Sequence, residues 1–397
     1  MTWADASRRR GVVVSTIGIT QTLAWGSTYY LPAIFADPIS AELHLSREWF
    51  FGIFSAALLL SGLLGPLAGR TIDRRGGRDV LAATSLIFAA GLVLLSFASG
   101  EVGLTVAWTV IGIGMGFGLY EAAFATVAGL YGHEARNAIT GITLFAGFAS
   151  TVGWPASAVF IQAFGWRGGC LAWAILHLLV GLPLNRLLVP KGLPLPPEKA
   201  PDHAAPAGAA GVPWTMIVLA GVFGATWFVS TAMAAHLPRL LEALGSTPAA
   251  AVFAASLVGP AQVAARLVEF SLLRRASAFV SARLATGLHP IAALLLAIIG
   301  PAVAIPFVLL HGAGNGMLTI ARGTLPLALF GAAGYGLRTG ILAAPARILQ
   351  GAAPLLFGLV LDRGGPLLAL LFSGTLTGLA FLALLLLRAP VRPLRNP

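Results

Sequence analysis

Twelve long apolar runs dominate this sequence and limit what it can fold into. Each has more than about 20 residues, the length at which an α-helix crosses the hydrocarbon core of a bilayer. Backbone N–H and C=O groups find no water in that core, so each run must satisfy them internally as a helix. The runs cover residues 11–36, 47–69, 79–99, 103–130, 137–164, 168–189, 213–239, 248–272, 279–300, 302–329, 338–361 and 366–387. The sequence therefore predicts an all-α membrane protein with twelve transmembrane helices.

Composition supports this class and excludes others. Of the 397 residues, 57% are hydrophobic and only 10% are charged, a balance foreign to soluble globular proteins. The net charge of +11 sits in short segments between the apolar runs, without the basic helix stripe of a nucleic-acid-binding protein. Cys170 is the single cysteine, and the seven histidines form no pair at metal-ligand spacing on a helix. We expect no metal, no cofactor and no nucleic-acid partner.

The chain is predicted to divide into two six-span halves. Residues 190–212 are rich in Pro, Ala and Gly, have no apolar period, and are typical of a linker. They separate an N-terminal bundle, residues 1–189, from a C-terminal bundle, residues 213–397. Short motifs recur in the same order in both bundles; Tyr131-Gly132, for example, returns 199 residues later as Phe330-Gly331. We therefore expect the two bundles to be pseudo-symmetric.

Lysine and arginine are distributed unevenly between the two sides of the membrane. With the N-terminus inside, the cytoplasmic segments hold 18 of these residues and the outer loops hold four. This bias predicts a multi-pass protein with both termini in the cytoplasm, and we expect it in a bacterial inner membrane. Three arginines remain inside the apolar runs: Arg266, Arg322 and Arg347.

A short basic stretch, GPLAGRTIDRRGGR at residues 65–78, joins the second and third apolar runs. It resembles the signature between helices two and three of the major facilitator superfamily, Gly-x-x-x-Asp-Arg-x-Gly-Arg, at Gly69, Asp73, Arg74 and Arg78, with two glycines, Gly76 and Gly77, where the signature has one. The resemblance implies two six-helix bundles with a binding site between them and transport by alternating access. Four residues are then expected to gate the cytoplasmic side: Asp73, Arg74, Arg78 and Arg338.

The eighth apolar run resembles the eighth helix of the monocarboxylate branch of that superfamily, which includes oxalate/formate antiporters. There an acid stands one turn before a substrate-binding arginine; here Gln262 holds the acid's position before Arg266. The family's proton-coupling scheme therefore does not carry over at this position. An arginine can bind a carboxylate through two parallel hydrogen bonds, so the resemblance implies an anionic substrate. The alternative is a structural ion pair of Arg266 with Glu121 or Glu269.

Other polar side chains inside apolar runs need a partner or a watery cavity, because burying them in lipid is costly. Glu269 is close enough to the end of its run to reach the surface. His311 can carry a proton near neutral pH, although a core histidine bonded to a backbone carbonyl is an equal alternative. With Arg266 and Gln262, the expected substrate-binding residues are Gln21, Trp25, Tyr120, Glu121, His311 and Asn315.

The sequence thus predicts a monomeric secondary transporter, not an enzyme, that moves a small organic anion such as a monocarboxylate. Its partners would be that small molecule, the lipid bilayer and, if transport is coupled, a proton. The alternative is proton-coupled efflux of a drug or metalloid. In drug antiporters an arginine tied to proton coupling stands at the position of Trp108, so its absence here weakens the drug-efflux alternative. A membrane sensor or enzyme is less favoured, because the close pair His133-Glu134 lies in a short turn.

Overall fold

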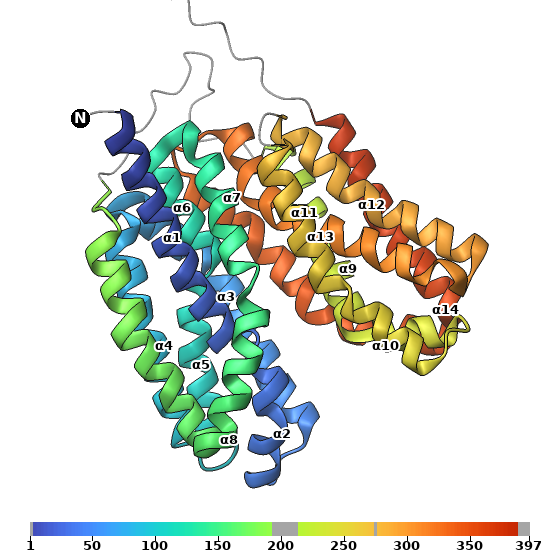
Figure 1. Ribbon diagram of the computed structural model, residues 1–397, viewed down its shortest axis with the longest axis horizontal. Helices are drawn as coiled ribbons and strands as arrows, with labels where there is room; N and C mark the ends of the chain where they lie inside the picture. Colours follow the sequence, from blue (N-terminus) through green and yellow to red (C-terminus); the bar gives the residue numbers. More distant parts are fainter. Residues whose placement is uncertain (1–2, 193–212, 274–275, 388–397) are drawn as a thin grey trace, which may run out of the picture. The chain divides into compact units, whose positions relative to one another are not determined.

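A computed structural model describes residues 3–192, 213–273 and 276–387, and this part of the chain contains helices and no β-strand (Figure 1). Most of the predicted linker, residues 193–212, lies outside the described residues. The α-helices are α1 Trp3–Ser27, α2 Pro32–Glu42, α3 Arg47–Arg75, α4 Gly77–Ser96, α5 Glu101–Gly118, α6 Tyr120–Tyr131, α7 Ala135–Ala146, α8 Ala149–Leu176, α9 Trp214–Ala243, α10 Pro248–Ser256, α11 Val258–Ser271, α12 Ala278–Ile299, α13 Ala304–Phe330 and α14 Tyr335–Leu386. Two π-helical segments, His177–Gly181 and Leu184–Leu188, extend the chain beyond α8.

The prediction of twelve membrane spans is confirmed. In the described chain, nine helical stretches are long and apolar enough to cross a membrane. Two of them, Ala135–Leu188 and Tyr335–Leu386, have 54 and 52 residues, and each breaks at one glycine, Gly165 or Gly365. Each of these two stretches is therefore a pair of spans, and α1 adds the first span of the chain.

The predicted repeat is visible in the backbone. Gly165 and Gly365 have φ of 68° and 79°, and they divide the fifth span from the sixth and the eleventh from the twelfth. Gly132 ends the fourth span with φ of 57°, and Gly331 ends the tenth with φ of 72°. Residues with a Cβ rarely adopt such values, so glycine recurs where each bundle makes the same turn.

Several predicted spans are broken helices, which periodicity alone did not predict. The first span is interrupted after Ser27 and resumes at Pro32, and it continues to Glu42 instead of ending near residue 36. Proline suits this restart, because its missing N–H costs nothing in the first turn of a helix. The fourth span breaks at Leu119, which has an extended backbone (φ −88°, ψ −165°) between α5 and α6.

The helices form two compact units that do not follow chain order. The first unit contains residues 1–198 and 332–351, and the second contains residues 199–331 and 352–397. The beginning of α14 therefore belongs with the N-terminal helices. The division into an N-terminal bundle, residues 1–189, and a C-terminal bundle, residues 213–397, remains a prediction from the sequence.

Four glycines explain why the beginning of α14 packs so closely on α3. A Cβ added at Gly69 would lie 1.8 Å from the carbonyl oxygen of Gly336, and one added at Gly340 would lie 2.3 Å from that of Gly65. Gly65 and Gly69 are spaced i, i+4 on α3, and Gly336 and Gly340 have the same spacing on α14. Each helix therefore presents one face of bare backbone to the other. Small-residue faces of this kind let membrane helices approach to backbone contact.

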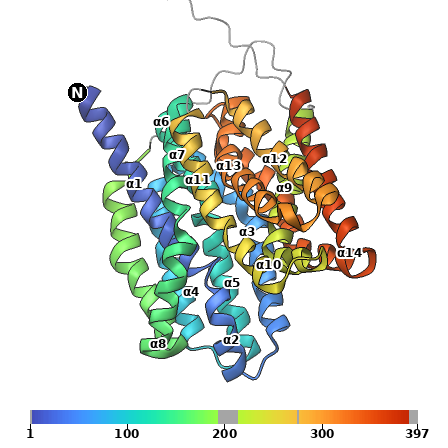
Figure 2. The same cartoon turned by 45° about the vertical axis from the view of Figure 1, so that its right-hand side comes forward.

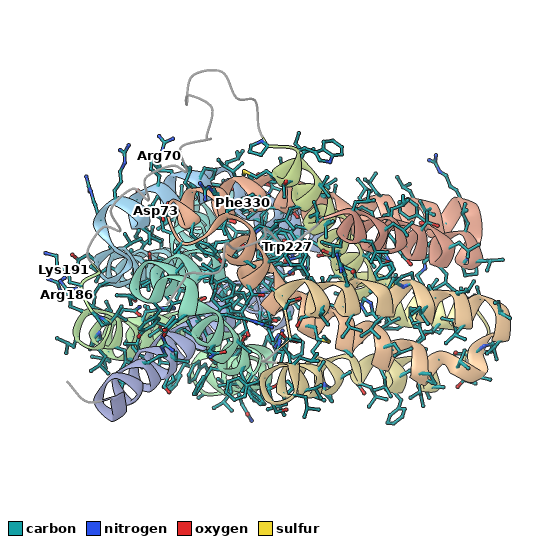
Figure 3. The ribbon with its side chains drawn as sticks, turned by 90° about the horizontal axis from the view of Figure 1, so that it is seen from above. Arg70, Asp73, Arg186, Lys191, Trp227 and Phe330 are labelled. Atoms are coloured by element: carbon teal, nitrogen blue, oxygen red, sulfur yellow. The ribbon has the colours of Figure 1, made fainter. Side chains whose placement is uncertain are left out.

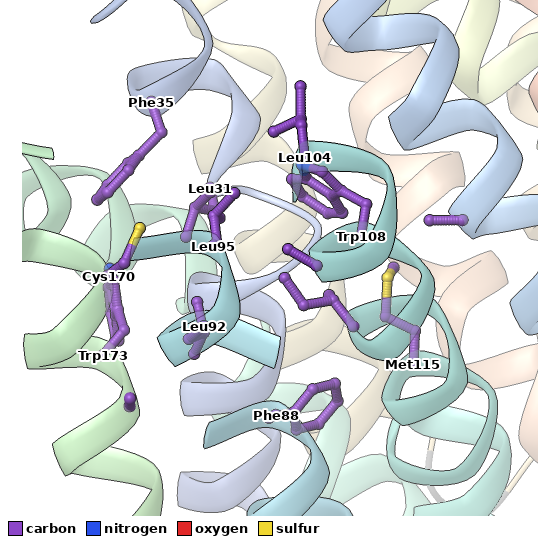
Figure 4. Close-up of a cluster of buried hydrophobic side chains, with 14 of the residues drawn as sticks. Leu31, Phe35, Phe88, Leu92, Leu95, Leu104, Trp108, Met115, Cys170 and Trp173 are labelled. Atoms are coloured by element: carbon purple, nitrogen blue, oxygen red, sulfur yellow. The ribbon is translucent and has the colours of Figure 1, made fainter. Parts of the chain in front are cut away.

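Each unit has its own apolar core. In the first unit α1 packs against α7 and α8, and α4 packs against α5 (Figures 1 and 2). Trp108 of α5 is fully buried there, as are Leu92 and Cys170 (Figure 4). In the second unit α13 packs against α11 and α12. Large apolar side chains such as Ile298 remain exposed, 73% in that case, as expected of a surface that faces lipid.

Candidate functional site

Arg266 lies on α11 and is buried, with 6% of its surface exposed. Its Nε donates to the carbonyl oxygen of Gly316 (3.4 Å), and its Nη2 donates to Gln262 Oε1 (3.4 Å) and Thr319 Oγ1 (3.3 Å). All three acceptors are neutral, and the distances are longer than those of strong hydrogen bonds. Nη1 donates to none of the described residues. Arg266 is thus a buried cation without a carboxylate partner in the described part of the chain.

Glu121 is balanced by a different arginine. Arg347 Nη2 donates to both carboxylate oxygens of Glu121, at 3.3 and 3.4 Å, and their side chains are 4% and 24% exposed. Arg347 Nη1 also donates to Gln350, whose amide donates to the hydroxyl of Tyr29 at 3.2 Å. The alternative that Glu121 serves as the ion-pair partner of Arg266 therefore has no support in the described contacts.

Glu269 also differs from the expectation that it reaches the surface. Its side chain is buried, and Oε1 accepts a hydrogen bond of 2.7 Å from Ser281 on α12. The hydroxyl of Ser281 holds the carboxylate inside the second unit.

Gln21 and Trp25 lie one turn apart on α1. Gln21 donates through Nε2 to the carbonyl oxygen of Gly118 at 2.6 Å, a carbonyl that the break at Leu119 leaves without its helical donor. Trp25 contacts Tyr120 of α6, with ring centroids 4.9 Å apart. Within the described chain, Gln21 Oε1 and Trp25 Nε1 are buried without a hydrogen-bond partner. Buried polar atoms of this kind are uncommon and are suited to contact with a ligand.

His311 and Asn315 lie one turn apart on α13, but they bond to different partners. His311 Nδ1 lies 2.9 Å from Nδ1 of His289 on α12, whereas Asn315 Oδ1 accepts a 2.8 Å hydrogen bond from Ser230 on α9. All four residues line a cavity of about 10 Å³ inside the second unit. The sequence alone does not reveal His289, because two histidines 22 residues apart on different helices have no local spacing that links them.

Asp73 lies at the C-terminal end of α3 and binds the beginning of α14. Its Oδ1 accepts the N–H of Gly336 and its Oδ2 accepts the N–H of Leu337, both at 2.9 Å. These N–H groups belong to the first turn of a helix and have no partner within it. A carboxylate there also interacts favourably with the positive end of the helix dipole. Asp73 and Gly334 line a cavity of about 200 Å³ at this end of the first unit.

Of the other residues expected to gate this end, Arg74 and Arg78 donate no described hydrogen bond to Asp73. Arg74 is exposed at the end of α3. Arg78 donates to Asp79 at 3.0 Å, and Asp79 also pairs with Arg186. Arg338 follows the two N–H donors within the first turn of α14, and its own N–H donates to Gly334. In Figure 3, Arg186 and Lys191 lie at the edge of the first unit, and Asp73 lies farther inside that unit.

One charged pair joins distant segments at the opposite end of each unit. In the first unit, Glu42 at the end of α2 accepts hydrogen bonds from the indole of Trp166 (2.5 Å) and from Arg167 (3.1 Å). In the second unit, Arg239 pairs with Asp362. Each unit thus has an ion pair that joins segments more than 120 residues apart in the chain.

The expected substrate-binding residues fall into two groups, one in each unit. Gln21, Trp25, Tyr120 and Glu121 lie in the first unit, near Arg347. Gln262, Arg266, His311 and Asn315 lie in the second. There Thr319 links two of them, because its hydroxyl donates to the carbonyl oxygen of Asn315 at 3.1 Å and accepts from Arg266.

Comparison with known proteins identifies the fold. The family model of the Major Facilitator Superfamily matches residues 17–334. Human monocarboxylate transporter 2 is 28% identical over 152 residues, and rat monocarboxylate transporter 3 is 32% identical over 143 residues. These matches cover 37% and 34% of this chain, and only about a third of either relative (31% and 29%). The crystal structure of the human organic anion transporter MFSD10 superposes with a TM-score of 0.73 at 16% identity, covering 95% of this chain and 99% of that one.

Proposed function

The chain belongs to the major facilitator superfamily, and from this premise we propose that it moves a small organic anion, such as a monocarboxylate, across the membrane by alternating access. The proposal is finer than the family, which contains transporters of many substrates. We further propose that both termini face the cytoplasm, as the distribution of arginine and lysine favours. We also propose that the membrane is a bacterial inner membrane.

The observation that carries this proposal is Arg266. A charged group inside a membrane span requires compensation, and the described partners of Arg266 are neutral. Arg347 meets the same requirement with Glu121. A substrate carboxylate would supply the missing charge at Arg266, and the two N–H groups of Nη1 would be its donors. Gln262 in place of an acid keeps this position open, because an acid there would compete with the substrate.

Two of the relatives support the proposal of an anionic substrate. The names of the two mammalian relatives state that they transport monocarboxylates, and the matched segments place this chain near them in sequence. A cationic substrate fits poorly, because it would approach a buried guanidinium.

Uptake into lipid vesicles tests this proposal. Purified protein is reconstituted, and uptake of labelled lactate is compared with that of labelled lactamide, its neutral analogue, and of lysine. We expect saturable uptake of lactate alone. Arg266→Lys keeps the charge but loses the planar pair of donors, so it should transport with a higher half-saturation concentration. Arg266→Gln should raise that concentration on the order of 10- to 100-fold, which is what a charge-assisted hydrogen bond contributes.

Arg283→Gln is the matched control for these variants. Arg283 also lies in the second unit, but it bonds to the main-chain carbonyls of Leu384 and Leu387, at 3.2 and 3.0 Å. Uptake of lactamide as fast as lactate, or equal lactate uptake by Arg266→Gln and Arg283→Gln, would overturn the proposal.

A further inference from the structure

The buried histidines of the second unit form a hydrogen-bonded chain whose direction can be assigned. Ser373 lies on α14, and its hydroxyl donates to the carbonyl oxygen of Leu370 at 2.8 Å. Its oxygen must then accept from His289, whose Nε2 lies 3.1 Å away. A neutral imidazole carries one N–H, so Nδ1 of His289 is an acceptor. Nδ1 of His311, 2.9 Å distant, is therefore the donor.

This assignment leaves one basic atom at the end of the chain. With its proton on Nδ1, neutral His311 has a lone pair on Nε2. A proton that binds there converts His311 to an imidazolium, and the Nδ1 proton can then move to Nδ1 of His289. His289 would then carry the charge and still donate to Ser373 through Nε2. One added proton is thus shared by two rings, and its release reverses the same movements.

The space around the two histidines is large enough for a proton or a water molecule, and it does not offer a metal site. Each histidine is 5% exposed, and the adjoining cavity of about 10 Å³ has the volume that a single water molecule needs. Ser230 and Asn315 form its polar wall, and the ring of Phe307 stacks on His311 with centroids 6.3 Å apart. Two imidazoles without a third ligand do not make a metal site, and no cluster of three metal-ligating side chains occurs among the described residues.

The charged groups of the neighbouring helices bond elsewhere: Glu269, the buried carboxylate of α11, accepts a hydrogen bond from Ser281 on α12. On α12, Arg283 is directed to main-chain carbonyls at the end of α14. On α13, Arg322 lies over the ring of Trp227 on α9, 4.5 Å from its centroid, and Arg266 of α11 contacts α13 one turn beyond Asn315. No carboxylate lines the cavity among the described residues. The extra proton is therefore retained only while the site is open to water, so its occupancy depends on conformation.

We propose that His311 and His289, supported by Ser373, form the proton-binding site that couples proton movement to transport. The inference rests on the proposed transport of an organic anion and deepens it by naming the co-transported ion. An anion and a proton that move together carry no net charge, which lowers the cost of moving a carboxylate through an apolar protein. The histidine pair would also replace the acid that the monocarboxylate branch has at the position of Gln262, which a glutamine cannot replace as a proton-binding group.

The ratio of protons to lactate entering vesicles tests the inference. Lactate uptake is measured by label and proton uptake by a trapped pH-sensitive dye, so that a purely structural defect lowers both and leaves their ratio unchanged. We expect protons to enter with lactate in the wild type, and the ratio to fall to zero in His311→Gln and in His289→Gln. His177→Gln is the matched control, because His177 is equally buried, in the first unit, and bonds to Ser27 at 2.8 Å.

A milder variant keeps the test decisive if the histidine variants fold poorly. The Ser373 hydroxyl accepts the Nε2–H of His289 and thereby stabilises the protonated pair of histidines. Ser373→Ala removes this acceptor. The pH at half-maximal proton-coupled uptake should then fall by about one unit. An unchanged pH profile, or an unchanged ratio in a well-folded His311→Gln, would overturn the inference while leaving anion transport intact.

Nuclear magnetic resonance of the purified protein with ¹⁵N-labelled histidine separates this inference from the proposed function. If the wild type moves no lactate, the proposed function fails. The site still stands if a coupled pair of histidine signals changes with pH and both signals disappear or shift in His311→Gln. Absence of any such coupled pair would refute the site whatever the substrate.

Discussion

At the scale of single residues, two buried arginines differ in what balances their charge. Arg347 has Glu121, and Arg266 has neutral partners among the described residues. The sequence identified both arginines as unusual, because a cation inside an apolar run is costly. The sequence does not show which of the two arginines pairs with Glu121, because contacts between different helices cannot be predicted from local spacing. This is also why His289 went unnoticed beside His311.

The ion pair of Arg347 and Glu121 leads to a prediction about stability. Arg347→Gln removes the cation and leaves a carboxylate that is 24% exposed inside a bundle. We expect a loss of about 1–3 kcal/mol, below the full value for a buried pair because water still reaches Glu121. Glu121→Gln combined with Arg347→Gln should recover most of that loss.

Thermal unfolding of the purified variants in detergent measures this effect. Arg239→Gln, which breaks the exposed pair with Asp362, serves as the control and should change the melting temperature little. If the double variant melts no higher than Arg347→Gln alone, the two side chains do not act as a pair.

At the scale of elements, the spans and their ends were largely predictable and the close contacts were not. Apolar length predicted the helices, and the recurrence of Tyr131-Gly132 as Phe330-Gly331 indicated the glycines at which the fourth and tenth spans end. Residues 65, 69, 336 and 340 are glycines in the sequence, but nothing in the sequence shows that they face one another across two helices. That pairing depends on how α3 and α14 meet, which is a property of the folded unit.

Contact between the backbones of α3 and α14 can be tested with one methyl group. Gly69→Ala would place a Cβ 1.8 Å from the carbonyl oxygen of Gly336, so the two helices must move apart. Gly52→Ala is the matched control on the same helix, because a Cβ there meets nothing within 4 Å. We expect Gly69→Ala to reduce lactate uptake severely and Gly52→Ala to leave it nearly unchanged.

Thermal unfolding of the purified variants in detergent provides a second readout of that contact. Gly69→Ala should melt at a lower temperature than the wild type, and Gly52→Ala should melt at nearly the same temperature. Equal melting temperatures of the two variants would show that the two helices do not rely on this contact.

At the scale of the whole molecule, the proposed function requires the end that carries Asp73 to open and close. Asp73 holds two N–H groups of α14, so we expect it to stabilise the state in which this end is closed. Asparagine accepts with one oxygen only, and its NH₂ group would face the second N–H. Asp73→Asn should therefore lose on the order of 1 kcal/mol of this contact and shift molecules toward the open state.

The rate of alkylation of a cysteine at position 333 reports this opening. Ala333 lines the cavity beside Asp73, and the native Cys170 is fully buried and should not react. Ala333→Cys should react faster in the Asp73→Asn background than in the Asp79→Asn background, which alters a neighbouring acid that pairs with Arg78 and Arg186. Equal rates in the two backgrounds would remove Asp73 from the gate.

The central claim is that Arg266 binds the charge of the substrate, and equilibrium binding tests it without the steps of transport. Purified wild type, Arg266→Gln and Arg283→Gln are dialysed against labelled lactate, and the dissociation constants are compared. We predict saturable binding by the wild type and by Arg283→Gln, and binding weaker by about tenfold or more in Arg266→Gln. Equal affinity of all three proteins for lactate would contradict the claim.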